Sequence, residues 1–341
     1  MSDKLFAGVE GGATNSKLVL MRGDGEILTW SEGPGSNYLL NGIPETIAII
    51  RNLLMDAKAK ASFPEDAPVG GIGMSLSGAE DEHANEAFIA ELEKTSLAQQ
   101  YYITSDSVGT IVTALEKGGI VMIAGTGSSC RLLNPNGSVH CCGGWGHMIG
   151  DHGSAYWISL QAVKTVFDTE DGINRSPYDI SFVKSKMLEF YKLKSKIGVM
   201  EHLHQKFHKA NFAKFCAVLA QGAVEERDLL CFHLFREAGR ILGRHILAVA
   251  KFANKSLLYQ EDGLPIVTVG SVWKSWELLK EGFLEGLQPR GRGDVKLEGI
   301  KLFRLKASPA IGAAYLAAKK ADVFLPIDFA SNAEIFFQTT L

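Results

Sequence analysis

The stretches Gly12–Lys17 (GATNSK) and Ala124–Ser129 (AGTGSS) decide the fold, because each opens the same pattern. In both, a short apolar run follows and leads to an Asx-Gly pair, within Asp24–Ile27 (DGEI) in the first copy and Asn136–Val139 (NGSV) in the second. The copies are in register, since three pairs of like residues lie 112 residues apart: Thr14 with Thr126, Ser16 with Ser128, and Gly25 with Gly137. Each copy predicts a strand, a Gly/Thr/Ser turn, a second strand and a hairpin.

Turns of this composition indicate phosphate binding. Glycines let backbone N–H groups approach an anion closely, and threonine hydroxyls add further donors. Two such turns facing each other across a cleft are expected to hold a polyphosphate. A hairpin with only a structural role is the alternative, and it is less favoured because the pattern occurs twice. Neither copy is a Walker loop, since Gly-x4-Gly-Lys-Ser/Thr occurs nowhere, and Cys130 stands where a Rossmann fingerprint needs glycine.

The composition is that of a globular protein large enough for two domains. The chain has 341 residues, of which 46% are hydrophobic and 21% charged. A formal net charge of −3 argues against binding to nucleic acid. No apolar run is as long as a membrane span, and Met1–Lys4 leads into a strand without a signal-peptide core, so we expect a cytosolic protein that contacts no membrane. The five irregularly spaced cysteines suggest no disulfide framework.

The predicted elements follow the same order, βββαβαβα, in both halves. In the first half, helices are predicted from Pro44 and over Asp81–Lys94 and Ser107–Leu115, and strands over Leu5–Val9, Lys17–Met21, Glu26–Trp30, Val69–Leu76 and Tyr101–Thr104. In the second half, helices are predicted over Ser154–Phe167, Lys274–Leu287 and Pro309–Lys319, and strands over Ile120–Ala124, Cys130–Leu133, Ser138–Cys142, Pro265–Val269 and Lys301–Leu305. A helix-rich insertion, about 169–253, interrupts the second half.

This order predicts an α/β protein with two like domains, residues 1–117 and 118–341, the second of which carries the insertion. Each domain is expected to be a mixed sheet covered by helices. The architecture resembles that of the actin-like ATPase and sugar kinase superfamily, whose domains are ribonuclease H-like.

Asp106 lies just after a predicted strand and before a helix, within Thr104–Gly109 (TSDSVG). The carboxyl ends of strands in such sheets line the crevice where ligands bind. A carboxylate there can accept the proton of an alcohol that attacks a phosphoryl group. The alternative is that Asp106 is an ordinary N-cap of the following helix.

The segment Gly143–Ser154 (GGWGHMIGDHGS) is the densest cluster of unusual residues. Its glycines expose backbone, Trp145 offers a flat face, and Asp151 offers a bidentate acceptor. This combination suits a sugar, which has apolar C–H faces and vicinal hydroxyls. The alternative is a glycine-rich loop with a core tryptophan, in which Asp151 caps the next helix.

Longer sequence words resemble the animal N-acetylglucosamine kinases of the BadF/BadG/BcrA/BcrD-type ATPase family. The resemblance covers essentially the entire chain, and the long words are very specific. The matching words are Gly8–Gly12 (GVEGG), Ser75–Gly78 (SLSG), Gly125–Ser128 (GTGS), Cys142–Met148 (CGGWGHM), Gly150–Asp151 (GD), Gly153–Trp157 (GSAYW), Gly243–His245 (GRH) and Val269–Phe283 (VGSVWKSWELLKEGF).

The resemblance implies a homodimeric enzyme that uses ATP and Mg²⁺ to phosphorylate the 6-hydroxyl of N-acetyl-D-glucosamine. The aspartate that matches Asp106 is the general base and also binds the sugar. The other implied sugar-binding residues are Asn37, Ser128, Ser129, Gly144, Trp145, Gly146 and Asp151. The implied ATP-binding residues are Gly11, Gly12, Thr14, Gly125, Thr126, Ala213, Gly270 and Ser271. Glu10 matches an acidic residue that holds magnesium through water.

Three positions depart from the family pattern. Ala13 replaces the third glycine of the first turn, so the turn must tolerate a Cβ. Ser129 stands where a sugar-contacting asparagine is common, and His152 where glutamate is common. Since serine is shorter and lacks an amide N–H, recognition of the acetamido group or of a ring hydroxyl is expected to weaken.

Two functions of another class remain open at this point. One is an ATP-driven activator of a redox partner, but the chain has no cysteine arrangement that indicates an iron–sulfur cluster. The other is a nucleotide-gated interaction protein without sugar turnover. The presence of Asp106, Trp145 and Asp151 favours an enzyme.

Overall fold

The computed structural model describes residues 4–291 and 293–341. Residues 1–3, on which the expected absence of a signal peptide partly rests, lie outside them. The chain divides into two compact units: unit 1 is Met1–Val121, Leu133–Gly137 and Lys301–Gln338, and unit 2 is Met122–Leu132, Ser138–Ile300 and Thr339–Leu341. Within the described ranges, no helix is long and apolar enough to cross a membrane.

Unit 1 is built on a five-stranded sheet with the order β3-β2-β1-β4-β5. Its strands are β1 (Leu5–Gly11), β2 (Asn15–Arg22), β3 (Ile27–Pro34), β4 (Val69–Leu76) and β5 (Tyr101–Ser105). The pairs β1–β2 and β2–β3 are antiparallel, whereas β1–β4 and β4–β5 are parallel. The parallel pairs bring the carboxyl ends of β1, β4 and β5 to the same end of the sheet.

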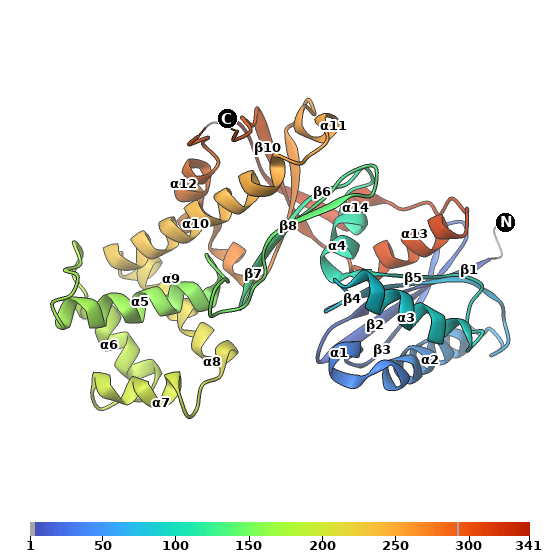
Figure 1. Cartoon of the computed structure of the whole chain (residues 1–341), viewed down its shortest axis with the longest axis horizontal. Coiled ribbons are helices and arrows are strands. Elements are labelled where there is room, and N and C mark those ends of the chain that lie inside the picture. Colours follow the sequence, from blue (N-terminus) through green and yellow to red (C-terminus); the bar gives the residue numbers. More distant parts are fainter. Residues whose placement is uncertain (1–3, 292) are drawn as a thin grey trace. The chain divides into compact units, whose positions relative to one another are not determined.

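Helices cover both faces of this sheet. The helices of unit 1 are α1 (Tyr38–Asn41), α2 (Ile43–Lys60), α3 (Glu82–Glu93), α4 (Asp106–Ala114), α13 (Ala310–Lys320) and α14 (Phe329–Asn332). Because alternate side chains of a strand point to opposite faces, Leu5 and Ala7 of β1 pack with residues of α2 and α3, whereas Phe6 packs with α13. Figure 1 shows α2 and α13 on opposite sides of the sheet.

The helix α13 belongs to unit 1 although it follows the second repeat in sequence. Two glycines permit its close approach: a Cβ on Gly8 would lie 1.9 Å from Ala310 O, and one on Gly73 would lie 1.8 Å from Ala313 O. The division predicted from the sequence, 1–117 and 118–341, differs from the observed units in residues 118–121, 133–137 and 301–338, which belong to unit 1. The chain order alone does not show that the last helix packs against the first sheet.

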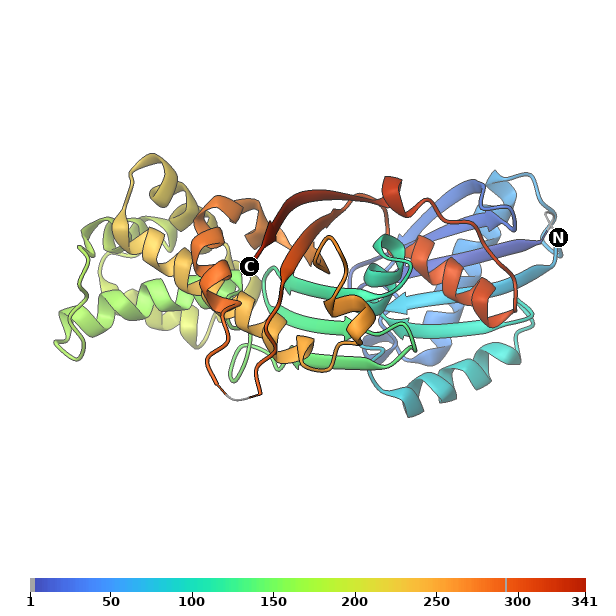
Figure 2. The ribbon, with the colours of Figure 1, turned by 90° about the horizontal axis from the view of Figure 1, so that it is seen from above.

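The second sheet has six strands in the order β11-β10-β9-β6-β7-β8. They are β6 (Gly119–Ala124), β7 (Ser128–Leu133), β8 (Val139–Gly143), β9 (Leu264–Val269), β10 (Gly299–Leu305) and β11 (Ala333–Thr340). From the opposite edge, β8-β7-β6-β9-β10 repeats the order of the first sheet, and β11 is an addition that the sequence did not predict. Figure 2 shows β6, β7 and β8 (green) side by side.

The predicted insertion is helical. The helices of unit 2 are α5 (Ala155–Glu170), α6 (Ser181–Phe190), η1 (Lys196–Gly198), α7 (Val199–Leu203), α8 (Lys209–Ala213), α9 (Phe215–Glu225), α10 (Leu229–Ala250), α11 (Lys255–Leu258), η2 (Ser271–Ser275) and α12 (Trp276–Gly286). The long helix α10 packs against α12 at glycines, since a Cβ on Gly282 would lie 1.8 Å from Arg236 O.

The two sheets and the helices around them confirm the predicted α/β fold class with two mixed sheets.

Candidate functional site

In unit 1, predicted site residues follow the ends of the parallel strands. Glu10 and Ser75 are register partners, and so are Ser75 and Thr104. Since neighbouring strands lie about 4.8 Å apart, the backbones of Glu10 and Thr104 are roughly 10 Å apart. Asp106 comes two residues after Thr104. Unit 1 therefore presents two carboxylates, Glu10 and Asp106, at one end of its sheet.

Glu10 is oriented by a serine from the end of the chain. Ser308 Oγ donates to Glu10 Oε2 at 2.5 Å. Among the described residues, no three His, Cys, Asp or Glu side chains form a group that could hold a metal ion. One carboxylate suits magnesium nonetheless, because Mg²⁺ commonly keeps several waters and binds substrate phosphates as well.

The first turn, residues 12–14, joins β1 to β2, and backbone hydrogen bonds from other parts of unit 1 hold it in place. Gly11 O accepts from Ser77 N at 2.8 Å, and Gly12 O accepts from Ser36 N at 3.1 Å. Thr14, at the tip of the turn, is exposed. These bonds fix the carbonyls and leave the threonine at the surface, as a phosphate-binding role requires.

Asn37 begins a short helix beside the first turn. Its Oδ1 accepts from Leu39 N at 3.0 Å and so caps α1. A Cβ on Gly78 would lie 3.4 Å from the Asn37 amide, so the asparagine is also near the end of β4. The predicted sugar contact of Asn37 remains a prediction.

Asp106 is the first residue of α4, and the N-cap is Ser105. Ser105 Oγ accepts from Val108 N, as an N-cap does. The alternative that Asp106 itself is the cap is therefore wrong. Asp106 therefore lies in the first turn of α4, near the positive end of the helix dipole.

The second turn, Gly125–Ser128, is held by hydrogen bonds from the start of helix α5. Ala155 N, at the start of α5, donates to Gly125 O at 2.9 Å, and Tyr156 N donates to Thr126 O at 3.4 Å. Thr126 is exposed and Ser128 is buried. This repeats the burial of Thr14 and Ser16 in the first turn.

Asp151 is joined directly to the second turn. Its Oδ1 accepts from Ser128 N at 3.0 Å, and Ser128 Oγ donates to His152 O at 2.8 Å. Asp151 has a φ of 57°, which is uncommon for a residue with a Cβ. The N-cap of α5 is Ser154, so the alternative that Asp151 caps this helix is wrong. The hydroxyl of Ser128 braces the loop, and its predicted sugar contact remains a prediction.

The glycine-rich loop presents its tryptophan to the surface. Trp145 is 74% exposed, which rules out the alternative of a core tryptophan. The flanking Gly144 and Gly146 have φ values of 85° and 78°. Gly144 N donates to Ser128 O at 3.1 Å, and a Cβ on Gly144 would lie 3.3 Å from Ser129 Cβ. The loop backbone is thus bound to the strand that follows the second turn.

Of the predicted adenosine-side residues, Gly270 contacts the second turn directly. Gly270, with a φ of 107°, packs so closely that its Cβ would lie 2.3 Å from Ala124 O. Ser271 follows it as the first residue of η2. Ala213 is buried, and its carbonyl accepts from Ser159 Oγ of α5 at 3.3 Å. Burial, with a smaller contribution from the Asp151 charge, raises the pKa of nearby Tyr156.

The predicted residues divide between the two units, and contacts join several of them within each unit. Unit 1 contributes Glu10, Gly11, Gly12, Thr14, Asn37 and Asp106. Unit 2 contributes Gly125, Thr126, Ser128, Ser129, Gly144, Trp145, Gly146, Asp151, Ala213, Gly270 and Ser271. Sequence analysis missed Ser308 and Lys209, whose Nζ lies 2.6 Å from Asp151 Oδ2. The sequence feature that could have pointed to Lys209 is that residues 202–214 contain no acidic side chain with which it could pair locally.

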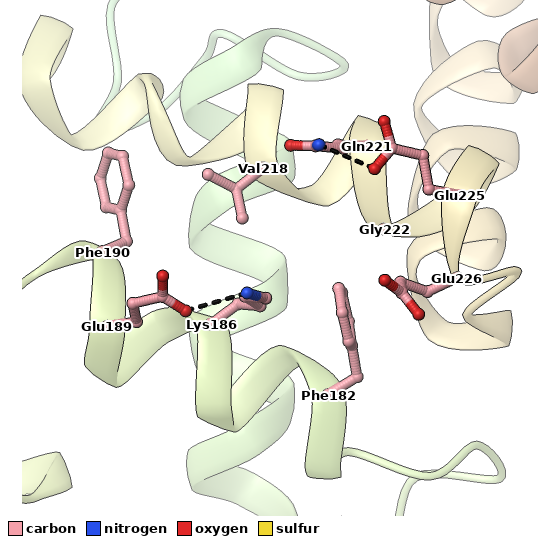
Figure 3. A pocket seen from close by; sticks show the side chains of 9 residues that line it. All are labelled: Phe182, Lys186, Glu189, Phe190, Val218, Gln221, Gly222, Glu225 and Glu226. Carbon is pink, nitrogen blue, oxygen red and sulfur yellow. Dashed lines mark hydrogen bonds and ion pairs between the residues drawn. The ribbon is translucent and has the colours of Figure 1, made fainter.

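A hollow of about 210 Å³ lies between α6 and α9 and contains none of these residues. Figure 3 shows its lining, which consists of Phe182, Lys186, Glu189, Phe190, Val218, Gln221, Gly222, Glu225 and Glu226. Lys186 Nζ donates to Glu189 Oε2 at 2.9 Å, and Gln221 Nε2 donates to Glu225 Oε2 at 2.8 Å. Lys186, the cation of this lining, is therefore already paired with Glu189. The other charged side chains of the lining are glutamates, which do not suit the phosphates of a nucleotide.

The repeated sheets and the two braced turns define the class of actin-like sugar kinase folds. A solved structure from Chromobacterium violaceum, assigned as an N-acetylglucosamine kinase, matches with a TM-score of 0.65 at 25% identity, over 93% of this chain and 99% of that chain. Residues 7–317 match the BadF/BadG/BcrA/BcrD ATPase family. The chain belongs to this family.

Curated relatives are amino-sugar kinases. An N-acetylmuramic acid/N-acetylglucosamine kinase of Clostridium acetobutylicum is 24% identical over 322 residues, which are 94% of this chain and 100% of the relative. An N-acetyl-D-glucosamine kinase of Dictyostelium discoideum is 27% identical over 189 residues, 51% of this chain and 57% of the relative. The predicted resemblance to animal enzymes in particular is not borne out, because the relative that matches over 322 residues is bacterial.

Proposed function

We propose that this chain transfers the γ-phosphoryl group of ATP to the 6-hydroxyl of N-acetyl-D-glucosamine. The observation that carries the proposal is the hydrogen bond from Ser128 N to Asp151 Oδ1. It makes the predicted phosphate-binding turn and the predicted sugar-binding carboxylate parts of one rigid piece. Family membership and the similarity to amino-sugar kinases support the same activity.

The reaction needs alignment and charge neutralisation more than covalent help from the protein. Asp106 accepts the proton of the 6-hydroxyl as its oxygen forms a bond to the γ-phosphorus. The bond from that phosphorus to the bridging oxygen breaks, and ADP leaves with the electron pair. Thr14, Thr126 and the turn amides hold the phosphates. Glu10 would hold magnesium, which supplies positive charge to the phosphate oxygens when bound.

Sugar recognition is proposed to come from unit 2. The exposed face of Trp145 packs on the C–H face of the ring, and Asp151 Oδ2 accepts from ring hydroxyls. The buried, backbone-anchored carboxylate is preorganised, so little order is lost when sugar binds. The expected cytosolic location and homodimer remain predictions.

A coupled ADP-release assay tests the proposal. N-Acetyl-D-glucosamine should support turnover, and glucose should support far less, because it lacks the acetamido group. N-Acetylmannosamine and glucosamine extend the panel. Asp106→Asn should lower kcat by about 10²–10⁴ while nucleotide affinity stays nearly unchanged. ADP release that does not depend on any amino sugar would contradict the proposed function.

A further inference from the structure

The ion pair between Asp151 and Lys209 has no role in the mechanism above. Lys209 Nζ lies 2.6 Å from Asp151 Oδ2, and Lys209 is the first residue of α8. The Asp151 side chain is 4% exposed and that of Lys209 is 31% exposed. A buried carboxylate is costly unless a cation or several donors are nearby, so Lys209 offsets the charge of Asp151.

Asp151 Oδ2 nevertheless keeps unused hydrogen-bonding capacity. The Lys209 ammonium, 2.6 Å away, is the donor that faces Oδ2, and no other hydrogen-bond donor to Oδ2 lies among the described residues. The other carboxylate oxygen already accepts from Ser128 N. A carboxylate oxygen can accept more than one hydrogen bond, so Oδ2 can also accept from a donor such as a sugar hydroxyl.

Lys209 also lies beside the second turn. A Cβ on Gly127 would lie 3.0 Å from Lys209 Nζ. Gly127 is inside the turn proposed to bind the phosphates of ATP. The lysine ammonium is a mobile point charge with three donors, so a small rotation of its side chain can move it from a carboxylate to a neighbouring phosphate.

The other lysines of this segment have partners elsewhere. Lys206 Nζ lies 2.6 Å from Glu201 Oε1, and Lys214 Nζ donates to Asn211 Oδ1 at 3.0 Å. The segment itself is held on the glycine-rich loop by aromatic packing, since the rings of Phe207 and His147 are 5.0 Å apart. Lys209 is thus held close to both Asp151 and the turn.

We propose that the two substrates share Lys209. With no sugar bound, Lys209 neutralises Asp151. When sugar hydroxyls donate to Asp151 Oδ2, Lys209 moves to the terminal phosphate of ATP. This inference rests on the proposed function, and it adds a phosphate-contacting residue to it. The buried carboxylate of Asp151 has a partner in both states, Lys209 before the sugar binds and the sugar hydroxyls afterwards. The exchange therefore leaves no buried charge without a partner. The consequence is that sugar and ATP bind with positive coupling, and ATP without sugar meets an incomplete phosphate site.

Calorimetric titration of the full chain with adenylyl imidodiphosphate and Mg²⁺ tests the coupling. In the wild type, saturating N-acetyl-D-glucosamine should tighten nucleotide binding by about 10-fold, within the range usual for coupled sites. In Lys209→Met the tightening should fall below about 2-fold. Adenosine, which has no phosphate, should show no tightening in either protein. Lys209→Met should also lower kcat by about 10²-fold.

Lys206→Met is the matched control, and it should keep the tightening of the wild type. Lys209→Arg should retain part of it, because the cation is preserved. If Lys209 only stabilised Asp151, its loss would weaken sugar binding with and without nucleotide and leave the tightening unchanged. That result would overturn the inference. So would a wild type without tightening.

Lys209→Gln keeps a donor for Asp151 and covers the case in which Lys209→Met misfolds. Complete loss of sugar binding in Lys209→Gln would contradict the inference, since Lys209 would then be needed for the sugar itself. The two proposals fail separately. A wild type that releases no ADP with amino sugars contradicts the proposed function, whereas an active wild type with unchanged tightening in Lys209→Met contradicts the inference alone.

Discussion

The first and second turns agree in exposure and differ in what holds them. Thr14 and Thr126 are both exposed, and Ser16 and Ser128 are both buried. The hairpin glycines that follow have φ values of 91° (Gly25) and 86° (Gly137). The two copies thus agree in the burial of these residues and in the positive φ of the hairpin glycine, because the strand–turn–strand geometry needs only small residues and glycine at fixed places.

The supports of the two turns are different. In unit 1 the turn carbonyls accept from the amides of Ser36 and Ser77. In unit 2 they accept from the first residues of α5, and Ser128 N binds the side chain of Asp151. The first turn is therefore held by backbone amides and by a serine pair, in which Ser16 Oγ donates to Ser36 Oγ at 2.7 Å, while the second is braced partly by the carboxylate proposed to bind sugar. We therefore expect a change at Ser128 or Asp151 to affect the proposed phosphate and sugar sites together.

An added methyl group should distinguish the turns most strongly. A Cβ on Gly127 would lie 2.4 Å from Asp151 Oδ1, whereas one on Gly12 would lie 3.2 Å from Asn15 O. Gly127→Ala must displace the Asp151 carboxylate by roughly 1 Å, and a shift of this size can cost about 10²-fold in rate. We expect that loss in kcat/KM for N-acetyl-D-glucosamine, with Gly12→Ala within a few-fold of wild type. Equal losses of kcat/KM in Gly127→Ala and Gly12→Ala would contradict the proposed difference between the turns.

The second largest effect concerns magnesium. Glu10 precedes the first turn, and the residue 112 positions later is Met122, so only the first turn has an acidic residue at this position of the strand before it. Ser308→Ala removes the hydrogen bond to Glu10 Oε2. Groups that orient a metal-binding carboxylate are typically worth about 10–100-fold in metal affinity. We expect the Mg²⁺ concentration for half-maximal activity to rise about 10-fold while the KM for sugar is unchanged.

Ser331→Ala is the matched control, because Ser331 Oγ donates to Asp328 O in the same C-terminal segment and is remote from Glu10 in sequence. An unchanged magnesium requirement in Ser308→Ala would show that Glu10 does not need this support, or that it does not bind the metal. Thermal melts of both variants should accompany the assay, since Ser308 Oγ also accepts from Ala310 N.

The repeat could be predicted from sequence because strand order follows from local signals. Apolar runs and Asx-Gly pairs mark the strands and hairpins of both halves, and the first sheet's strand order recurs in the second. The strand β11 was missed because its residues Ala333–Thr340 are mostly half-buried or exposed and show no clean alternation. Its place at a sheet edge depends on pairing with β10, which only the folded chain defines.

The tertiary placement of the site could be predicted only in part. Strand ends located Glu10 and Asp106, since parallel strands share an end. The helix caps were assigned one or more residues away from Ser105 and Ser154, because Ser and Asp are nearly equal as N-caps. Lys209 was missed because the contact joins residues 58 positions apart in sequence, through an insertion whose path has no local signal.

A smaller effect should appear with pH, in unit 2. His245 is buried, and a Cβ on Gly143 would lie 3.0 Å from its Nε2, so it supports the base of the glycine-rich loop. Burial lowers the pKa of His245 in the folded protein. Below the unfolded value of about 6.5 the unfolded chain binds the proton more readily, so stability falls as the pH drops from 6.5 toward and below the folded value.

Melting temperatures at pH 7.5 and 5.5 measure this effect. The wild type should lose roughly 2 °C more than His245→Gln, equivalent to about 1 kcal/mol, because the glutamine does not titrate. Among the residues that the structure describes, His245 is the buried histidine, and it lies in unit 2, so we assign the difference to unit 2. Identical pH dependence of wild type and variant would contradict the assignment to His245.

The smallest effect is expected in the first turn at Ala13, where the family usually has glycine. Ala13 is exposed and is not among the residues with positive φ, so its turn accepts a Cβ. The close approach in this turn is made by Gly35, whose Cβ would lie 2.3 Å from Ala13 O. Ala13→Gly should therefore leave ATP affinity within about 2-fold and reduce stability by about 0.4–1 kcal/mol, through the greater entropy of the unfolded chain. A gain in ATP affinity of 10-fold or more on restoring the glycine, measured by the same titration, would mean that the methyl group obstructs the phosphates and that the two turns differ in ligand access as well as in support.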